Sequence, residues 1–338
     1  MLGIDFRAAR WTWTAALVLL GIWLVYLLRS TLFVFVLAVL FAYLMAPLVD
    51  VIDRFLPGHR TRTLALALSY ILFIGIVATG AILIGSRVAQ QATELSKTLP
   101  GTLSAWQQKL PDSIKDQVTE KVNDIVGSLP GVSVKFLGLL SNLIYVVIIP
   151  VLAFLCLKDG TAVKRHVLGL FEPGPQRKLL DDVLADMDLV LAHYMRSLVL
   201  LALNAFTCYS IFLSVIGMPY GILLGVLAGM LEFIPVVGPL AAALMVLIVG
   251  AASQGPIVGI MIFLAAFRMF QDYVLSPHLM GRGVELHPLL VLFGVFAGAE
   301  LAGVAGTFLS VPVLAFIRVL YQRVYQARID AQGAKLVA

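Results

Sequence analysis

Long apolar runs, separated by short polar stretches, dominate the chain from residue 11 to residue 318. A helix needs about 20 apolar residues to cross the hydrocarbon core of a bilayer. Runs that approach or exceed this length predict roughly eight transmembrane helices. Their ranges are 11–28, 31–52, 63–86, 132–157, 197–217, 218–250, 256–275 and 288–318. The pattern therefore predicts an all-α, multi-spanning integral membrane protein.

One polar segment, residues 87–131, follows the third predicted span. Its apolar residues recur three and four positions apart, which is typical of an amphipathic helix. Pro100, Gly101 and Pro111 are expected to break it into pieces, because proline interrupts helical hydrogen bonding. The order of the spans places this segment outside the cytoplasm. Two roles remain open for it: a cap that packs on its own bundle, or a subunit-contact or gating element.

A second polar segment, residues 158–196, is the predicted cytoplasmic connection. Its Glu-Pro-Gly-Pro run at 172–175 indicates a turn. The amphipathic stretch after this turn predicts a helix lying against the cytoplasmic surface before the fifth span. The chain is thus expected to comprise N-terminal transmembrane helices (1–86), an extracytoplasmic amphipathic segment (87–131), one transmembrane helix (132–157), a cytoplasmic connection (158–196), a C-terminal transmembrane core with interrupted helices (197–320) and a cytoplasmic tail (321–338).

Basic residues in the short loops predict the orientation of the chain. Lysine and arginine concentrate in cytoplasmic loops. Four basic groups fall on one face if the N-terminus is cytoplasmic and the number of spans is even, which places the C-terminus in the cytoplasm too. They are Arg7 and Arg10; Arg54, Arg60 and Arg62; Lys158, Lys164 and Arg165; and Arg318, Arg323 and Arg328.

Composition supports a membrane protein and argues against a soluble enzyme. The chain is 61% hydrophobic and 13% charged, whereas soluble domains are roughly 45–50% apolar and about 25% charged. The net charge of +5 is interpreted as an orientation signal, so nucleic acid is not an expected partner. Cys156 and Cys208 lie in apolar runs without C-x-x-C spacing, so neither a metal nor another cofactor is expected.

Ionisable residues concentrate in the apolar stretches of the C-terminal half: Glu232, Arg268, Asp272, Glu285 and Glu300. A charge at the bilayer centre costs about 2.5–3.5 kcal/mol on insertion scales, so such residues usually face a cavity, a partner or water. Arg268 and Asp272 are four residues apart and can pair on one helix face, with Gln271 beside them. The alternative to a role in transport is that Arg268 and Asp272 pair only to stabilise their helix.

The backbone around Glu232 is predicted to break. Two prolines and a glycine, at Pro235, Gly238 and Pro239, interrupt a long apolar run. Proline removes a backbone donor and clashes with the preceding turn, so the helix must kink or end there. The freed backbone groups cannot face lipid and need protein or a water-filled cavity around them.

A second break is predicted around Glu300. The run GVFAG at 294–298 precedes Glu300, Gly303 and Gly306, as GVLAG at 225–229 precedes the first break. Paired interruptions of this kind are a sequence indication of a transporter binding site between structural repeats. We therefore expect two broken helices or re-entrant hairpins to meet near the bilayer midplane.

These segments resemble the autoinducer-2 exporter family, and the agreement extends from about residue 15 to residue 325. The matching pieces are EFIPVVGP at 232–239, DYVLSP at 272–277, LHP at 286–288, the glycines at 298, 303 and 306, and VPV at 311–313. The resemblance implies a bacterial inner-membrane secondary transporter, multi-pass and homo-oligomeric. Some members are associated with export of autoinducer-2, and similar proteins of salt-tolerant bacteria with sodium/proton antiport.

Three functions stay open at this point. The first is export of a small polar solute, with autoinducer-2 as a candidate; the second is cation/proton antiport; the third is a non-transporting membrane scaffold. No Walker motif and no His-Glu-x-x-His or Gly-x-Ser-x-Gly site occurs, so neither direct ATP use nor an enzyme is expected. The expected partners are the lipid bilayer and a small polar solute, proton or sodium ion. The predicted pathway residues are Glu232, Pro235, Gly238, Pro239, Arg268, Gln271, Asp272, Pro277, Glu300, Gly303 and Gly306.

Overall fold

The computed structural model describes residues 6–56, 62–107, 143–280 and 286–337, and its regular elements within these ranges are helical. They are α1 (Phe6–Leu27), α2 (Arg29–Phe55), α3 (Arg62–Gln107), α5 (Leu143–Gly169), α6 (Pro175–Val215), α7 (Gly221–Leu231), α8 (Val237–Ala252), α9 (Ile257–Phe270), the π-helical turn η1 (Gln271–Leu275), α10 (Ser276–Met280) and α11 (Pro288–Val337). The predictions for residues 108–142 and for Glu285 lie outside the described residues.

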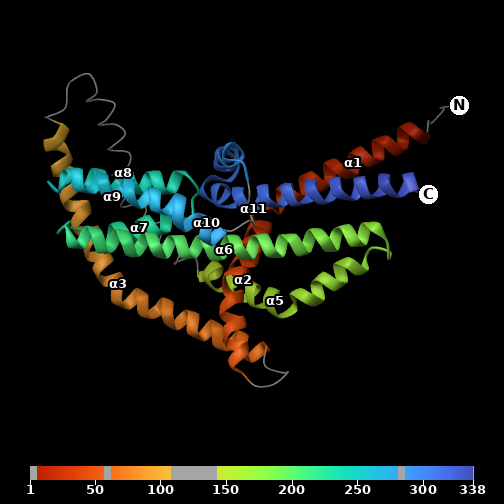
Figure 1. The fold of residues 1–338 in the computed structure, drawn as a ribbon, viewed down its shortest axis with the longest axis horizontal. Coiled ribbons are helices and arrows are strands. Elements are labelled where there is room, and N and C mark those ends of the chain that lie inside the picture. Colours follow the sequence, from red (N-terminus) through yellow and green to blue (C-terminus); the bar gives the residue numbers. More distant parts are fainter. Residues whose placement is uncertain (1–5, 57–61, 108–142, 281–285, 338) are drawn as a thin grey trace.

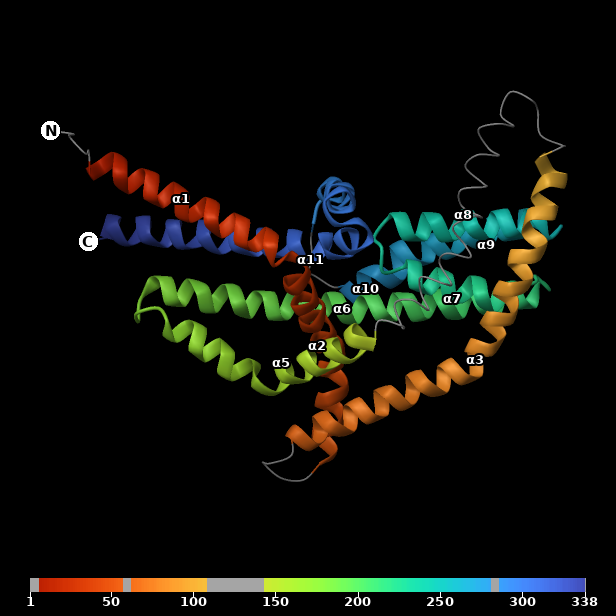
Figure 2. The same ribbon diagram turned by 180° about the vertical axis from the view of Figure 1, so that it is seen from behind.

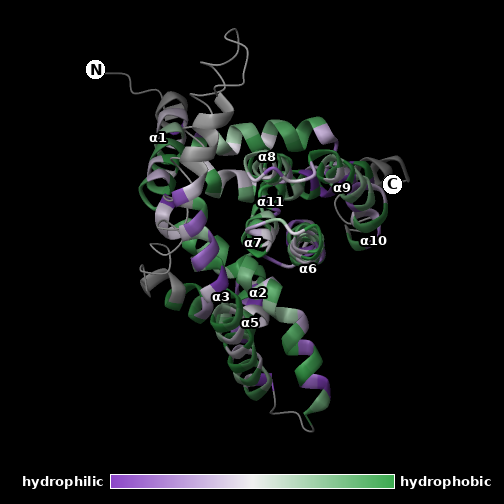
Figure 3. Ribbon diagram, turned by 90° about the vertical axis from the view of Figure 1, so that its left-hand side faces the viewer, coloured by the Kyte–Doolittle hydropathy of each residue, from purple (hydrophilic) through white to green (hydrophobic). Residues whose placement is uncertain are grey.

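The all-α membrane architecture is confirmed. Within the described ranges, six helices are long and apolar enough to cross a membrane. Two shorter apolar helices, α7 and α8, together cover the predicted span 218–250. Most of the ribbon is hydrophobic in Figure 3, including surfaces that no other helix covers. Such surfaces are stable in lipid, because exposing this much apolar surface to water would cost a large free energy.

Helix α6 joins the two ends of the molecule. At one end α7 packs against it, α9 contacts it through aromatic rings and α8 packs on α7 and α9, and at the other end the C-terminal part of α11 runs beside it (Figures 1 and 2). The largest buried core lies between α6, α7, α8 and α9. A smaller core, including Val183, Ala315 and Val319, joins α6 to α11.

Glycines bring α7 close to α6. Gly221, Gly225 and Gly229 recur every fourth residue and share one helix face. A Cβ atom added at Gly229 would lie 2.7 Å from the carbonyl oxygen of Ala202 on α6. Small residues at this spacing let helix backbones approach closely in membrane proteins. The backbone of α7 therefore lies directly against α6.

The predicted break at Pro100 and Gly101 is wrong. Helix α3 continues through both residues to Gln107, so the third span and the start of the amphipathic segment form one helix. A proline removes one helical hydrogen bond but need not end a helix that packing supports. Such support exists here, because Leu95 is buried in the core formed by α6 to α9.

The predicted turn at 172–175 is confirmed, but the helix after it is not a separate surface helix. It begins at Pro175 and continues without interruption to Val215 as α6. The reason is local, since residues 176–215 contain neither proline nor glycine. A helix of 41 residues is about 60 Å long, roughly twice the hydrocarbon thickness. Part of α6 must therefore extend beyond the bilayer.

Candidate functional site

The predicted break near Glu232 is confirmed. Helix α7 ends at Leu231 and α8 begins at Val237. Between them, the amide of Ile234 donates to the carbonyl of Leu231 (2.9 Å), and the amide of Val237 donates to that of Pro235 (2.6 Å). Val236, at the centre of this last turn, has φ 63° and ψ −57°. This is a strained γ-turn, and a β-branched residue rarely adopts it.

Gly238 allows the two half-helices to meet. Its amide donates to the carbonyl of Ile234 (2.9 Å), and a Cβ atom on it would collide with the carbonyl oxygen of Leu231. The glycine is buried, so a side chain there could not turn away from the contact. The chain thus reverses over a few residues and leaves Glu232 at the end of α7.

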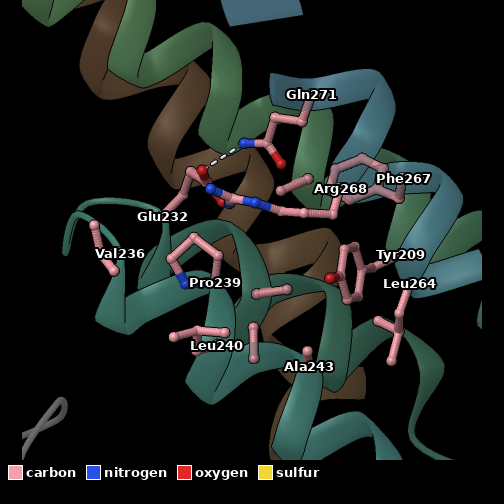
Figure 4. A pocket seen from close by; sticks show the side chains of 13 residues that line it. Tyr209, Glu232, Val236, Pro239, Leu240, Ala243, Leu264, Phe267, Arg268 and Gln271 are labelled. Atoms are coloured by element: carbon pink, nitrogen blue, oxygen red, sulfur yellow. Dashed lines mark hydrogen bonds between the residues drawn. The ribbon is translucent and has the colours of Figure 1, made fainter. Parts of the chain in front are cut away.

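A pocket of about 200 Å³ opens beside this break (Figure 4). Helix α6, the α7–α8 break and α9 with η1 form its walls. Its polar side consists of Glu232, Arg268, Gln271 and Tyr209, and the rest of its lining is apolar. The apolar residues are Ala205, Ala228, Val236, Pro239, Leu240, Ala242, Ala243, Leu264 and Phe267.

A π-helical turn places Gln271 in the pocket wall. Helix α9 gives way at Gln271 to η1, in which each turn holds one residue more than an α-helical turn. The Gln271 side chain is 2% exposed, and its Nε2 donates a hydrogen bond to Oε1 of Glu232. A buried amide would be costly without such a partner. Gln271 therefore holds the Glu232 carboxylate in one orientation.

Arg268 and Asp272 form the predicted i,i+4 ion pair, with 2.7 Å between Nε and Oδ2. Both side chains are partly exposed. Figure 4 shows Arg268 extending across the pocket toward Glu232. Among the residues that line the pocket, Glu232 supplies a carboxyl group and Arg268 a guanidinium, while Asp272 lies outside the lining. The pocket therefore offers both an acceptor and donors of hydrogen bonds.

The second predicted break is confirmed as well. Helix α11 is interrupted at Ala302 (φ −145°) and Gly303 (φ 61°, ψ −142°), where two helices join. Beyond this point the chain folds back on itself. The backbones of Gly298 and Gly306 lie so close together that a Cβ atom on either would collide with the backbone of the other. Helix α11 thus contains a tight helical hairpin.

The two breaks touch, but they do not share the pocket. The ring of Phe233, next to Glu232, lies 6.2 Å from that of Phe308 on the far arm of the hairpin. Glu300 and Gly303 are exposed and Gly306 lies at the hairpin contact, and none of the three lines the pocket. Pro277 is exposed on α10, also away from it. The pocket thus brings together Glu232, Pro239, Arg268 and Gln271, with Asp272 attached through its ion pair.

Tyr209 is the polar residue of the pocket lining that was not predicted from the sequence. It is 5% exposed, and its ring packs edge-on against Phe263 and Phe267 at 5.3 and 5.1 Å. Its hydroxyl points into the cavity in Figure 4. A hydroxyl-bearing aromatic in the middle of an apolar span was the available signal, because buried tyrosines usually direct their hydroxyl to a polar partner.

Comparison with known proteins is consistent with this architecture. A sequence model of the AI-2E family transporters matches residues 14–326. Over 312 residues the chain is 26% identical to the Bacillus subtilis (strain 168) protein named "Putative transport protein YrrI", covering 87% of each chain. It is also 23% identical over 285 residues to a sodium-lithium/proton antiporter of Halobacillus andaensis, covering 76% of this chain and 79% of that one.

Proposed function

The chain belongs to the AI-2E family of transporters, and from this premise we propose that it is a secondary transporter that exports a small polar solute through the pocket at Glu232. The observation that carries the proposal is the position of this carboxylate at a helix break between apolar helices. An ionisable group in such a place needs a polar path around it. Autoinducer-2 is one candidate solute.

The pocket favours a solute with two chemically different sides. Its volume of about 200 Å³ is below the range of roughly 300–1,000 Å³ typical of drug-sized ligands. Glu232 can accept hydrogen bonds from solute hydroxyls, and Arg268 and Tyr209 can donate to its oxygens. The alanines, Leu264 and Phe267 would contact carbon atoms on the opposite side.

The driving force in this proposal is an ion gradient. The sequence contains no Walker motif. Protonation of Glu232 would weaken its hold on a bound donor, so exchange of solute for proton at one carboxylate would couple the two movements. We further propose a bacterial inner-membrane location with both termini in the cytoplasm, and a homo-oligomeric assembly.

Cation/proton antiport is the second candidate, and the carboxyl group of Glu232 in the pocket favours it. Arg268 forms an ion pair with Asp272, while the hydrogen bond to Glu232 comes from the neutral amide of Gln271. A monovalent cation could therefore neutralise Glu232 in place of a proton. The antiporter relative from Halobacillus andaensis supports including this alternative.

Purified protein in proteoliposomes tests both candidates. One series loads small polar solutes and measures efflux under a pH gradient, and the other applies a sodium gradient and follows a pH dye. We expect Glu232→Gln to reduce flux about tenfold or more, because a hydrogen bond to a charged group contributes about 1.5–3 kcal/mol. Glu300→Gln is the matched comparison, and its effect should be smaller because Glu300 lies outside the pocket.

The outcomes separate the functions. Solute efflux that depends on Glu232 supports export, and sodium-driven proton movement that depends on it supports antiport. If correctly folded protein shows neither flux, the non-transporting scaffold is favoured. Flux that is equal in wild type and Glu232→Gln would refute the assignment of the pocket.

A further inference from the structure

The distal half of α3 holds the start of α7 by hydrogen bonds. Oε1 of Gln91 accepts a hydrogen bond from the backbone amide of Leu223 (2.9 Å). Oγ1 of Thr98 and the hydroxyl of Tyr220 are also hydrogen-bonded (2.9 Å). Leu223 is in the first turn of α7, where backbone amides have no partner within the helix.

Helix α7 cannot supply this cap from its own sequence. The residue before it, Tyr220, has a left-handed backbone (φ 69°) and its side chain forms no capping bond. The amide of Leu223 is instead satisfied by Gln91, a residue 132 positions earlier in the chain. Capping bonds of this kind stabilise a helix start.

The capped helix leads directly to the pocket. Helix α7 has 11 residues, so its two ends are about 16 Å apart. Glu232 immediately follows its last residue. One face of α7 is the glycine face, which lies directly against α6. The hydrogen bonds from α3 act at the end opposite Glu232.

Packing keeps this part of α3 in place. Leu95 is 4% exposed and belongs to the core shared by α6 to α9, with Val88 and Ala92 packed against it. The described part of the amphipathic segment therefore packs on its own chain. Its buried face and its hydrogen bonds both meet the helices that form the pocket.

We propose that Gln91 is a positioning residue for transport: its side-chain carbonyl caps α7 and thereby keeps Glu232 in the pocket, which makes the distal half of α3 a control element for the site. The inference rests on the proposed function of the pocket. It adds a means by which a change at the distal half of α3 would alter transport from a distance of about 16 Å, the length of α7. Helix α7 would be the element that moves, and the hydrogen bond between Gln91 and Leu223 would hold it in place.

Two substitutions of similar size separate a hydrogen-bond role from a packing role. Gln91→Glu keeps an acceptor oxygen, and a carboxylate is favourable at a helix N-terminus. Gln91→Met fills the same space without an acceptor. The neighbouring Gln90 is exposed and forms the matched control as Gln90→Met.

We expect Gln91→Met to raise the apparent KM by up to about fivefold, because loss of a cap shifts a helix equilibrium by roughly that factor and affinity falls with the fraction of protein in the competent state. Gln91→Glu and Gln90→Met should keep wild-type KM. A wild-type KM for Gln91→Met would overturn the proposal. An equal defect in Gln91→Glu would also overturn it, since an acceptor oxygen at this position would then fail to preserve transport.

A second measurement does not depend on transport. A cysteine introduced as Val236→Cys, with Cys156→Ser and Cys208→Ser, reports on the pocket because Val236 lines it. We expect a water-soluble maleimide to label this cysteine at a changed rate when Gln91→Met is added, and at an unchanged rate with Gln90→Met. Equal rates in both would refute the positioning role. If no variant or wild type transports any solute, the proposed function fails while this labelling still tests the cap.

Discussion

The hairpin in α11 leads to a sharp prediction about Gly306. A Cβ atom added there would overlap the carbonyl of Gly298 and lie 3.1 Å from the Cβ of Ala302. The overlap is with backbone, so no rotamer change can relieve it, and the two arms of the hairpin must separate. Overpacking of this kind costs about 1–3 kcal/mol. Alanine in place of glycine recovers about 0.5–1 kcal/mol of conformational entropy in a helix.

Gly306→Ala should therefore destabilise the protein by a net of about 1 kcal/mol, from the central values of these two opposing effects. A change of 1 kcal/mol shifts Tm by about 2–4 °C in chains of 150–250 residues, and somewhat less in a longer chain. We expect a decrease of about 2 °C. The assay is intrinsic fluorescence during heating in one detergent at one scan rate, because unfolding of such proteins is commonly irreversible.

Two further glycines serve as controls. Gly80 lies inside α3 with open space around its Cβ position, so Gly80→Ala should preserve or raise Tm. Gly303 has open space too but φ 61°, so Gly303→Ala isolates backbone strain from overlap. If Gly306→Ala is as stable as Gly80→Ala, the close contact between the hairpin arms is refuted.

Two other predictions concern stability away from the hairpin. Val236→Gly should raise Tm slightly, because release of strain of about 1–3 kcal/mol exceeds the entropic cost of glycine; the adjacent Val237→Gly, at the first residue of α8, should lower it. Arg323 donates to Asp186 from two nitrogens at 2.6 and 2.7 Å, but both side chains are about one-third exposed. A double-mutant cycle with Arg323→Gln and Asp186→Asn should give a coupling below about 1 kcal/mol that shrinks with added salt; a salt-independent coupling of several kcal/mol would contradict this assignment.

Features that depend on neighbouring residues could be predicted from sequence. The break after Glu232 follows from proline chemistry at Pro235, and the apolar runs identify lipid as the solvent. The ion pair between Arg268 and Asp272 follows from helical spacing alone. These rules act within one or two helical turns, so they hold unless distant packing overrides them, as it does at Pro100.

Predictions failed or were missing where distant segments decide the outcome. Pro100 would end an isolated helix, but Leu95 anchors α3 in a core made by residues more than 100 positions later. The sequence repeat placed Glu300 beside a second break, but only the folded chain shows that its side chain is exposed and lies outside the pocket at Glu232, so its role in transport stays a prediction. Local pattern cannot reveal such results, because they depend on which surfaces other helices bury.

By itself, the sequence determined the solvent, the approximate spans and both interruptions, since each depends on hydrophobicity or backbone chemistry along a few residues. Only the tertiary structure decided which polar groups meet. It joined Gln271 to Glu232 through a π-turn, and Gln91 to Leu223 across 132 positions. The physical reason is that a buried polar group takes whichever partner the packed helices bring within reach, and that choice is made in space rather than along the chain.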